Sequence, residues 1–178
     1  RRDAIVKLVS LEDAWQLFLE SPSCASMTAL RDLIVCDEEY APNASVLVEL
    51  TELLCDEDFA QLQRRTEELM PAWAICPRVH FFAGCAAEGL GDADEVELCR
   101  FLAASCVDGI LSTGEGTRSD PWLVTYPSDA QDCLARLGVT ITSLQVVDAH
   151  DVLLDAITAS DGRTYWFEVT ELVAAGRM

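Results

Sequence analysis

Thr113-Gly114-Glu115-Gly116-Thr117 separates two halves of the chain that differ in the spacing of their apolar residues. Before this stretch, apolar residues recur at helical spacing, and after it they alternate as they do in strands. Two glycines so close together supply the backbone angles that a compact turn needs. The stretch therefore predicts a hinge between a helical region, residues 1–112, and a small α/β module, residues 113–178, which we expect to pack as one folding unit.

The helical region is predicted to contain antiparallel hairpins stacked side by side, because the connections between its helices are short. Two of these helices, joined by Gly89-Leu90-Gly91-Asp92, resemble one tetratricopeptide-type unit in layout. The chain has no fixed-period repeat, so we expect a tetratricopeptide-like layer and no true solenoid. The predicted helices cover approximately residues 11–21, 22–36, 43–54, 56–70, 79–88 and 93–111.

The second half is predicted to be a β-α-β-β-β module, so that the fold class is α+β. Ser128 and Gln131 have the spacing of a capping box for a helix that Gly138 ends. Asp161-Gly162 is a hairpin signal, and the last connections are too short for crossovers, so an antiparallel meander is expected. The predicted strands cover residues 122–126, 139–147, 152–158 and 164–169, and the residues expected to face the helices are Trp122, Tyr165, Trp166 and Phe167.

The net charge of −19 is the feature of the composition that most restricts the possible partners of this protein. A nucleic-acid ligand has to be neutralised by clusters of Lys and Arg, and the chain has none beyond two arginine pairs. Anionic membrane surfaces are disfavoured for the same reason. The charge is compatible with a basic protein or peptide as partner, or with a solvated acidic surface alone.

The eight cysteines are expected to be reduced residues, most of them in the core. No two of them form a C-x-x-C pair, which zinc sites commonly contain. Cys99 and Cys106 fall on one face of a helix but about 10 Å apart along its axis, too far for a disulfide. We therefore expect no disulfide and no bound metal for Cys24, Cys36, Cys55, Cys76, Cys85, Cys99, Cys106 and Cys133.

Nucleophilic catalysis would require a Ser or Cys with a His and a carboxylate, and the chain has only two histidines, His80 and His150. His80 lies at the start of a predicted helix and is expected to be structural, and His150 is expected in an exposed turn. Gly114-Glu115-Gly116 lacks the third glycine of a dinucleotide fingerprint and the Gly-Lys-Ser/Thr of a P-loop. No catalytic, cofactor-binding or metal-binding residue is assigned, and no cofactor is expected.

One resemblance rests on Ile110–Thr117, the apolar strand after it, the helix that ends Leu134-Ala135-Arg136-Leu137-Gly138, and the final Tyr165-Trp166-Phe167-Glu168-Val169. These residues resemble a family of uncharacterised bacterial proteins in which a helical region ends in a Gly-Asp-Gly-Thr-like turn followed by a small β module. Glu115 stands here where that family more usually has Asp. The resemblance implies a bacterial source and a shared fold, and it brings no catalytic residues.

These observations favour a binding or scaffold protein that uses a helical surface of acidic character over an enzyme. Two alternatives stay open: a hydrolase-like enzyme with an unrecognised Cys/His/Asp site, and an acidic inhibitor or immunity-type protein that binds a basic target. The first alternative requires a deep pocket in which His80 or His150 meets a cysteine or a carboxylate. No signal peptide or span of about 20 apolar residues is evident, so a cytoplasmic location is expected.

Overall fold

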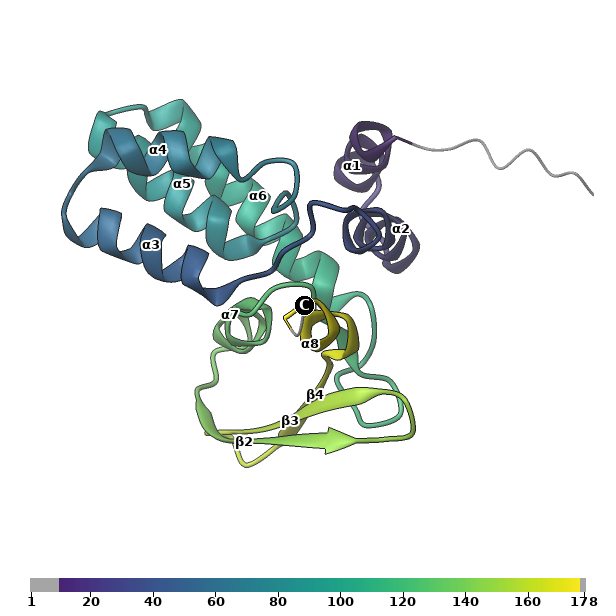
Figure 1. The fold of residues 1–178 in the computed structure, drawn as a ribbon. Helices are drawn as coiled ribbons and strands as arrows, with labels where there is room; N and C mark the ends of the chain where they lie inside the picture. The colour runs from purple at the N-terminus through teal and green to yellow at the C-terminus, as the bar shows by residue number, and fades with distance from the viewer. Residues whose placement is uncertain (1–9, 177–178) are drawn as a thin grey trace, which may run out of the picture.

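The computed structural model describes residues 10–176 and confirms the α+β class. Figure 1 shows α3 to α6 stacked as one layer, α1 and α2 as a hairpin beside it, and α7 and α8 between the helices and the sheet. The elements are α1 (Leu11–Glu20), α2 (Cys24–Val35), α3 (Ala44–Cys55), α4 (Phe59–Glu68), α5 (Pro77–Leu90), α6 (Ala93–Leu111), β1 (Trp122–Leu123), α7 (Asp129–Arg136), β2 (Ile141–Asp148), β3 (Leu153–Ala159), β4 (Thr164–Glu168) and α8 (Thr170–Ala175).

Short polar side chains determine where most of the helices begin. Ser10, Asn43, Asp58 and Asp92 each accept a hydrogen bond from a backbone N–H in the first turn of the helix that follows. These bonds satisfy amides that have no partner within the helix. The predicted starts of α1, α3, α4 and α6 therefore agree with the structure to within a few residues.

The helix predicted over residues 79–88 is longer in the structure: α5 continues through Gly89 and is capped by Gly91, whose φ of 80° is left-handed. The role of Gly89 is steric. A Cβ added there would lie 2.3 Å from the ring of Phe59 on α4. The missing side chain thus allows α4 and α5 to approach closely.

The two glycines of the predicted hinge have different roles. Gly116 has a φ of 67°, in the left-handed region, and a Cβ there would lie 2.5 Å from the ring of Trp122. Gly114 has no positive φ, but a Cβ there would lie 2.5 Å from the carbonyl oxygen of Pro121. The turn therefore closes on the segment that leads into β1, and both positions exclude a side chain.

The sheet has the order β1-β4-β3-β2, and the predicted antiparallel meander of β2, β3 and β4 is confirmed. The prediction of a strand over residues 122–126 was too long, because β1 covers only two residues and pairs in parallel with β4. After β1, side chains bind the backbone carbonyls of the chain. Arg31 donates to the carbonyl of Val124, and the hydroxyl of Tyr40 donates to that of Thr125. The helix α8 had no counterpart in the sequence prediction.

The predicted capping box at the start of α7 is wrong. Ser128 has helical backbone angles, and no side chain caps the first turn of α7. One carboxylate oxygen of Asp129 accepts the backbone N–H groups of Thr125 and Tyr126 at 2.8 and 2.9 Å. The loop that joins β1 to α7 is therefore held closed by an aspartate that is itself fully buried.

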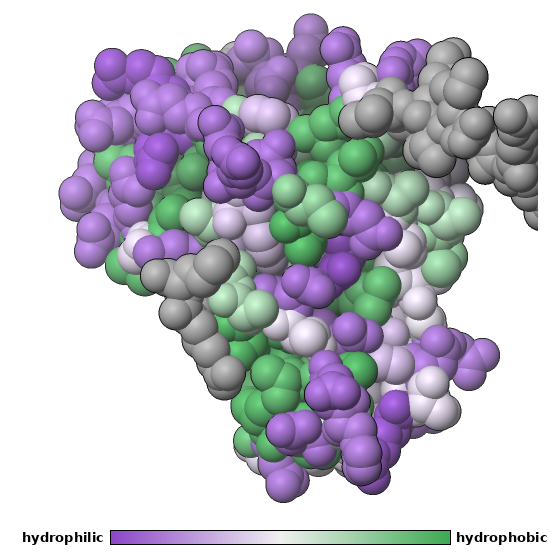
Figure 2. Space-filling model, turned by 45° about the vertical axis from the view of Figure 1, so that its right-hand side comes forward, coloured by the Kyte–Doolittle hydropathy of each residue, from purple (hydrophilic) through white to green (hydrophobic). Residues whose placement is uncertain are grey.

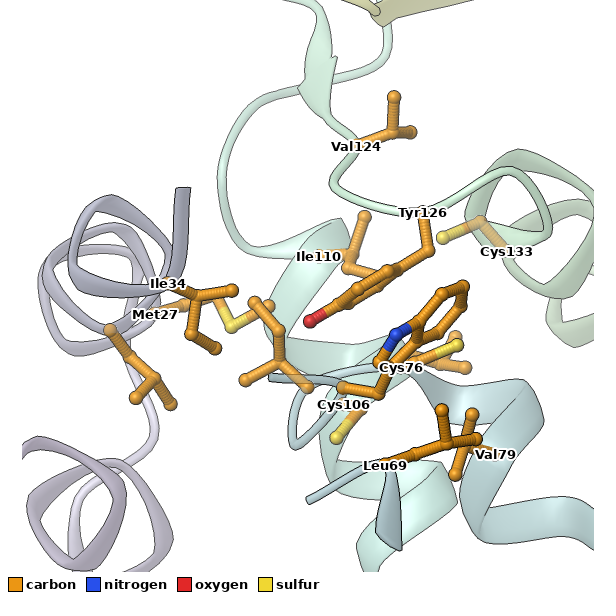
Figure 3. Close-up of a cluster of buried hydrophobic side chains, with 14 of the residues drawn as sticks. Met27, Ile34, Leu69, Cys76, Val79, Cys106, Ile110, Val124, Tyr126 and Cys133 are labelled. Carbon is orange, nitrogen blue, oxygen red and sulfur yellow. The ribbon is translucent and has the colours of Figure 1, made fainter. Parts of the chain in front are cut away.

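The core extends from the helices into the module. Tyr126, on the loop between β1 and α7, is 1% exposed and belongs to the same buried cluster as residues of α2, α5, α6 and α7. Figure 3 shows its ring pointing into this cluster, with Met27 and Ile34 on one side and Cys133 on the other. The ring stacks on Trp73 with 4.7 Å between centroids. Tyr126 thus fixes the module to the helical layer.

The aromatic residues expected to face the helices divide between the two sides of the sheet. Trp122 and Phe167 are buried in the core cluster, and Tyr165 packs against it. Trp166 is only partly buried and lies under the guanidinium of Arg118, 5.4 Å from its ring centroid. The expectation for Trp166 was therefore wrong, because residues that alternate along a strand point to opposite faces.

Candidate functional site

A large groove is bounded by α1, by the segment from the end of α4 to Ala74, and by α5 and α6. Its volume is about 630 Å³. We call it the α1 groove. Its apolar walls come from Leu11, Trp15, Met70, Pro71, Ala74, Ala83 and Leu102, and its polar lining comes from Glu12, Thr66, Glu67, His80, Glu95 and Cys99.

His80 lines this groove from the first turn of α5, yet it is only 4% exposed. Its Nε2 lies 2.7 Å from the carbonyl oxygen of Ala74, and its ring stacks on Trp15 with 6.1 Å between centroids. Burial lowers the pKa of His80, against the opposing effect of the bond to Ala74. The imidazole is therefore neutral at pH 7, with its Nε2 proton donated to Ala74.

Cys99 is the thiol that lines the same groove, on α6. Its Sγ donates to a carboxylate oxygen of Glu95 at 3.5 Å. Burial and the nearby charge of Glu95 raise the pKa of Cys99 to about 11. Because the thiolate is the nucleophile, a raised pKa is the opposite of what a catalytic cysteine needs. The groove brings a histidine and a cysteine together without activating either.

The mouth of the groove is acidic. Glu12 lies on α1, Glu67 on the last turn of α4, and Glu95 on the first turn of α6. Among the groove residues, all of which lie in the described part of the chain, none is Lys or Arg. Carboxylates from three elements thus line the groove beside its apolar walls, and the described residues that line it include no cation.

His150 is not part of this site. It lies in the turn between β2 and β3, is exposed, and has a φ of 54°. Its neighbour Asp151 also has a positive φ, of 71°. The structure therefore places the two histidines in different parts of the fold, and the turn expected for His150 is present.

Cysteines occupy the core less completely than expected. Cys76, Cys99, Cys106 and Cys133 are buried and Cys85 is half-buried, whereas the other three are exposed. All eight are free thiols. Within residues 10–176, no group of three His, Cys, Asp or Glu side chains is arranged to hold a metal ion.

The polar residue that sequence reasoning missed is Asp129. It is fully buried, and burial raises its pKa to about 7, with the two backbone amides that it accepts acting in the opposite direction. Its second oxygen and the hydroxyl of Thr125 have no hydrogen-bond partner among the described residues. An aspartate in the first turn of a predicted helix gives no sign of such burial, since the usual place for it is the solvated end of the helix.

Comparisons with models of protein families, with curated proteins and with solved structures found no match to this chain. The resemblance to a bacterial family therefore stays a prediction. No helix within the described residues combines the length and the apolar character needed to cross a bilayer.

Proposed function

We propose that this protein binds another protein through the α1 groove, and that the partner presents apolar side chains flanked by Lys or Arg. The observation that carries this proposal is the combination of an apolar groove of about 630 Å³ with carboxylates at its mouth. A helix laid into a groove buries a stripe of apolar side chains, and its flanking charges then meet the rim. The net charge of −19 strengthens the attraction of a basic partner.

The polar groups of the groove favour a peptide over a small molecule. Small-molecule sites combine apolar walls with a few convergent polar groups that orient the ligand. Here the Nε2 of His80 is bonded to Ala74 and the thiol of Cys99 to Glu95. Because these polar groups already have partners within the chain, the groove would contact a ligand mainly through its apolar walls. A partner helix binds in this way.

The groove chemistry also bears on the hydrolase alternative. A neutral His80 that donates to a backbone carbonyl and a Cys99 with a pKa raised to about 11 do not form an activated pair. We therefore rank binding above catalysis for this groove.

The test uses two synthetic amphipathic helical peptides with the same leucine stripe, one flanked by Lys and the other by Glu. Isothermal titration calorimetry of the Lys peptide is expected to show binding, and the Glu peptide is expected to bind at least about tenfold more weakly. Ala83→Leu, which fills the groove, is expected to weaken the Lys peptide. Ala60→Leu, on the exposed side of α4, serves as the matched control.

Equal binding of both peptides would contradict the role of the acidic side chains of the groove. Unchanged binding of the Lys peptide to Ala83→Leu would show that the peptide does not bind in the α1 groove. Failure of the Lys peptide to bind at all would overturn the proposal.

A further inference from the structure

The walls of the α1 groove leave apolar surface accessible. Leu11, Trp15 and Leu102 line the groove, and each of them is only half-buried. Figure 2 shows hydrophobic surface among the helices in the upper half of the molecule, bordered by polar side chains. Apolar grooves rimmed by polar residues are typical of sites that hold another segment of protein.

The three carboxylates of the groove have no ionic partner in the described part of the chain. Glu12 and Glu67 are exposed, and Glu95 accepts the thiol hydrogen of Cys99. The salt bridges within residues 10–176 involve other carboxylates. A basic occupant of the groove would therefore meet negative charges that are not already neutralised.

Residues 1–9, which precede the described part of the chain, have the composition that the groove selects. The three basic side chains are Arg1, Arg2 and Lys7, and the acidic one is Asp3, so this segment carries a charge of +2 in a chain whose net charge is −19. Its other five residues, 4–6 and 8–9, are all apolar. We call residues 1–9 the basic segment.

The chain enters α1 beside the groove. Leu11 is the first residue of α1 and lines the groove, and Glu12 and Trp15 follow it there. Nine residues of extended chain span at most about 30 Å. Packed helices lie about 8–10 Å apart, so this length is enough to pass from α1 across α5 to α6.

We propose that the basic segment occupies the α1 groove of its own chain and has to be displaced by an external partner. Its apolar side chains then lie against the groove walls, and its basic side chains lie near Glu12, Glu67 and Glu95. The inference rests on the proposed function, because it gives the same groove an internal ligand. The basic segment thus lowers the apparent affinity of the protein for its partner.

The short connection favours the basic segment of the same chain over that of a second copy. Only Ser10 separates the segment from Leu11, which is part of the groove. A short tether gives an effective concentration on the order of millimolar. A second copy would have to reach a comparable concentration to compete for the groove.

Isothermal titration calorimetry with the Lys-flanked peptide tests the autoinhibition. The double variant Arg2→Glu with Lys7→Glu is expected to bind the peptide at least about fivefold more tightly than the unmodified protein, because the groove is released. Arg118→Glu with Arg163→Glu is the matched control. It changes the net charge equally, at exposed positions outside the groove, and so measures the general effect of added negative charge. Circular dichroism checks that both variants are folded.

Photo-cross-linking tests where the basic segment lies. With p-benzoylphenylalanine in place of Leu8, irradiation is expected to attach this position to groove residues of the same chain. Trypsin cleaves after Arg65, Arg78 and Arg100, so mass spectrometry should find the link in peptides 66–78 or 79–100, which together supply most of the groove lining. The same group in place of Val146, which is exposed on β2, is the control and should give neither product.

Cross-links that reach neither peptide overturn the inference, and so do cross-links that join two chains, since the occupant would then be a second copy. Peptide binding by the Arg2→Glu/Lys7→Glu variant that is no tighter than by the control also overturns it and leaves the proposed function standing. Failure of every variant to bind the Lys peptide overturns the proposed function instead, and cross-linking still decides where the basic segment lies.

Discussion

The hydroxyl of Tyr126 donates a hydrogen bond of 2.6 Å to the carbonyl of Ala72. The bond joins residues that are 54 positions apart, one in the loop between β1 and α7 and the other between α4 and α5. Arg31 and Tyr40 add bonds from α2 and from the segment after it to the same loop. The residues from Val124 to Asp129 are thus the joint at which the module meets the helices.

Removing the Tyr126 hydroxyl should destabilise the fold modestly, and removing the ring should do so strongly. Tyr126→Phe leaves the carbonyl of Ala72 without this donor, and we expect a loss of about 1–2 kcal/mol. Tyr126→Ala also opens a cavity beside Trp73, and we expect a loss of roughly 3–5 kcal/mol. Urea unfolding measures both, and equal effects of the two variants would contradict the role of the ring.

Asp129 should make stability depend on pH. Its folded pKa of about 7 lies above the ordinary value of 3.8, so the buried carboxyl favours folding most at low pH. That contribution is fully present below the ordinary pKa and is lost as the pH rises through about 7. It amounts to roughly 4 kcal/mol at about 1.4 kcal/mol per pH unit. Asp129→Asn keeps an acceptor for the two amides and cannot ionise.

The comparison of Asp129→Asn with the unmodified protein isolates this effect from the other carboxylates. We expect the variant to be the more stable protein at pH 8 and to lose most of that advantage at pH 5. Urea unfolding at the two pH values provides the measurement. A difference between the proteins that stays constant with pH would show that Asp129 does not titrate in this range.

Gly116→Ala should be more damaging than the same change at Gly162. Both glycines have a positive φ, of 67° and 82°, so both variants bear a backbone cost of roughly 1–2 kcal/mol. Only at Gly116 does the new Cβ also meet the ring of Trp122, at 2.5 Å, whereas nothing lies within 4 Å at Gly162. Thermal unfolding should rank Gly116→Ala clearly below Gly162→Ala.

Thiol reactivity should follow burial. Cys24, Cys36 and Cys55 are exposed, and we expect them to be alkylated rapidly in the folded protein. Burial raises the pKa values of Cys76, Cys106 and Cys133, so these thiols should react only when the chain opens. Mass spectrometry of timed samples gives the order, and denaturation without reductant should expose eight thiols.

The rim of the α1 groove should determine the salt dependence of partner binding. Replacing Glu12, Glu67 and Glu95 together by Gln should lower the association rate of the Lys-flanked peptide at low salt and flatten its decline with added salt. Stopped-flow kinetics measures this rate. The matched control removes three exposed carboxylates outside the groove, Glu38, Glu39 and Glu115, and should have a smaller effect.

Local chemistry made much of the fold predictable. The helical period predicted α1, α3 and α6, and their starts are local features, because the caps at Ser10, Asn43 and Asp92 each bind an amide within one turn. The Asp161-Gly162 turn located the β3–β4 hairpin for the same reason, and the φ of 82° at Gly162 is the property that glycine supplies.

Long-range packing decided the rest. The parallel pairing of β1 with β4, the α1 groove and the burial of Asp129 each bring together residues far apart in the chain. The apolar residues from Trp122 to Tyr126 resembled a strand because this loop is buried, with Trp122, Val124 and Tyr126 all in the core cluster, and a buried loop can be as apolar as a strand. The spacing of apolar residues in the sequence indicates which residues are buried. Only the tertiary structure determines which distant residues pack against them.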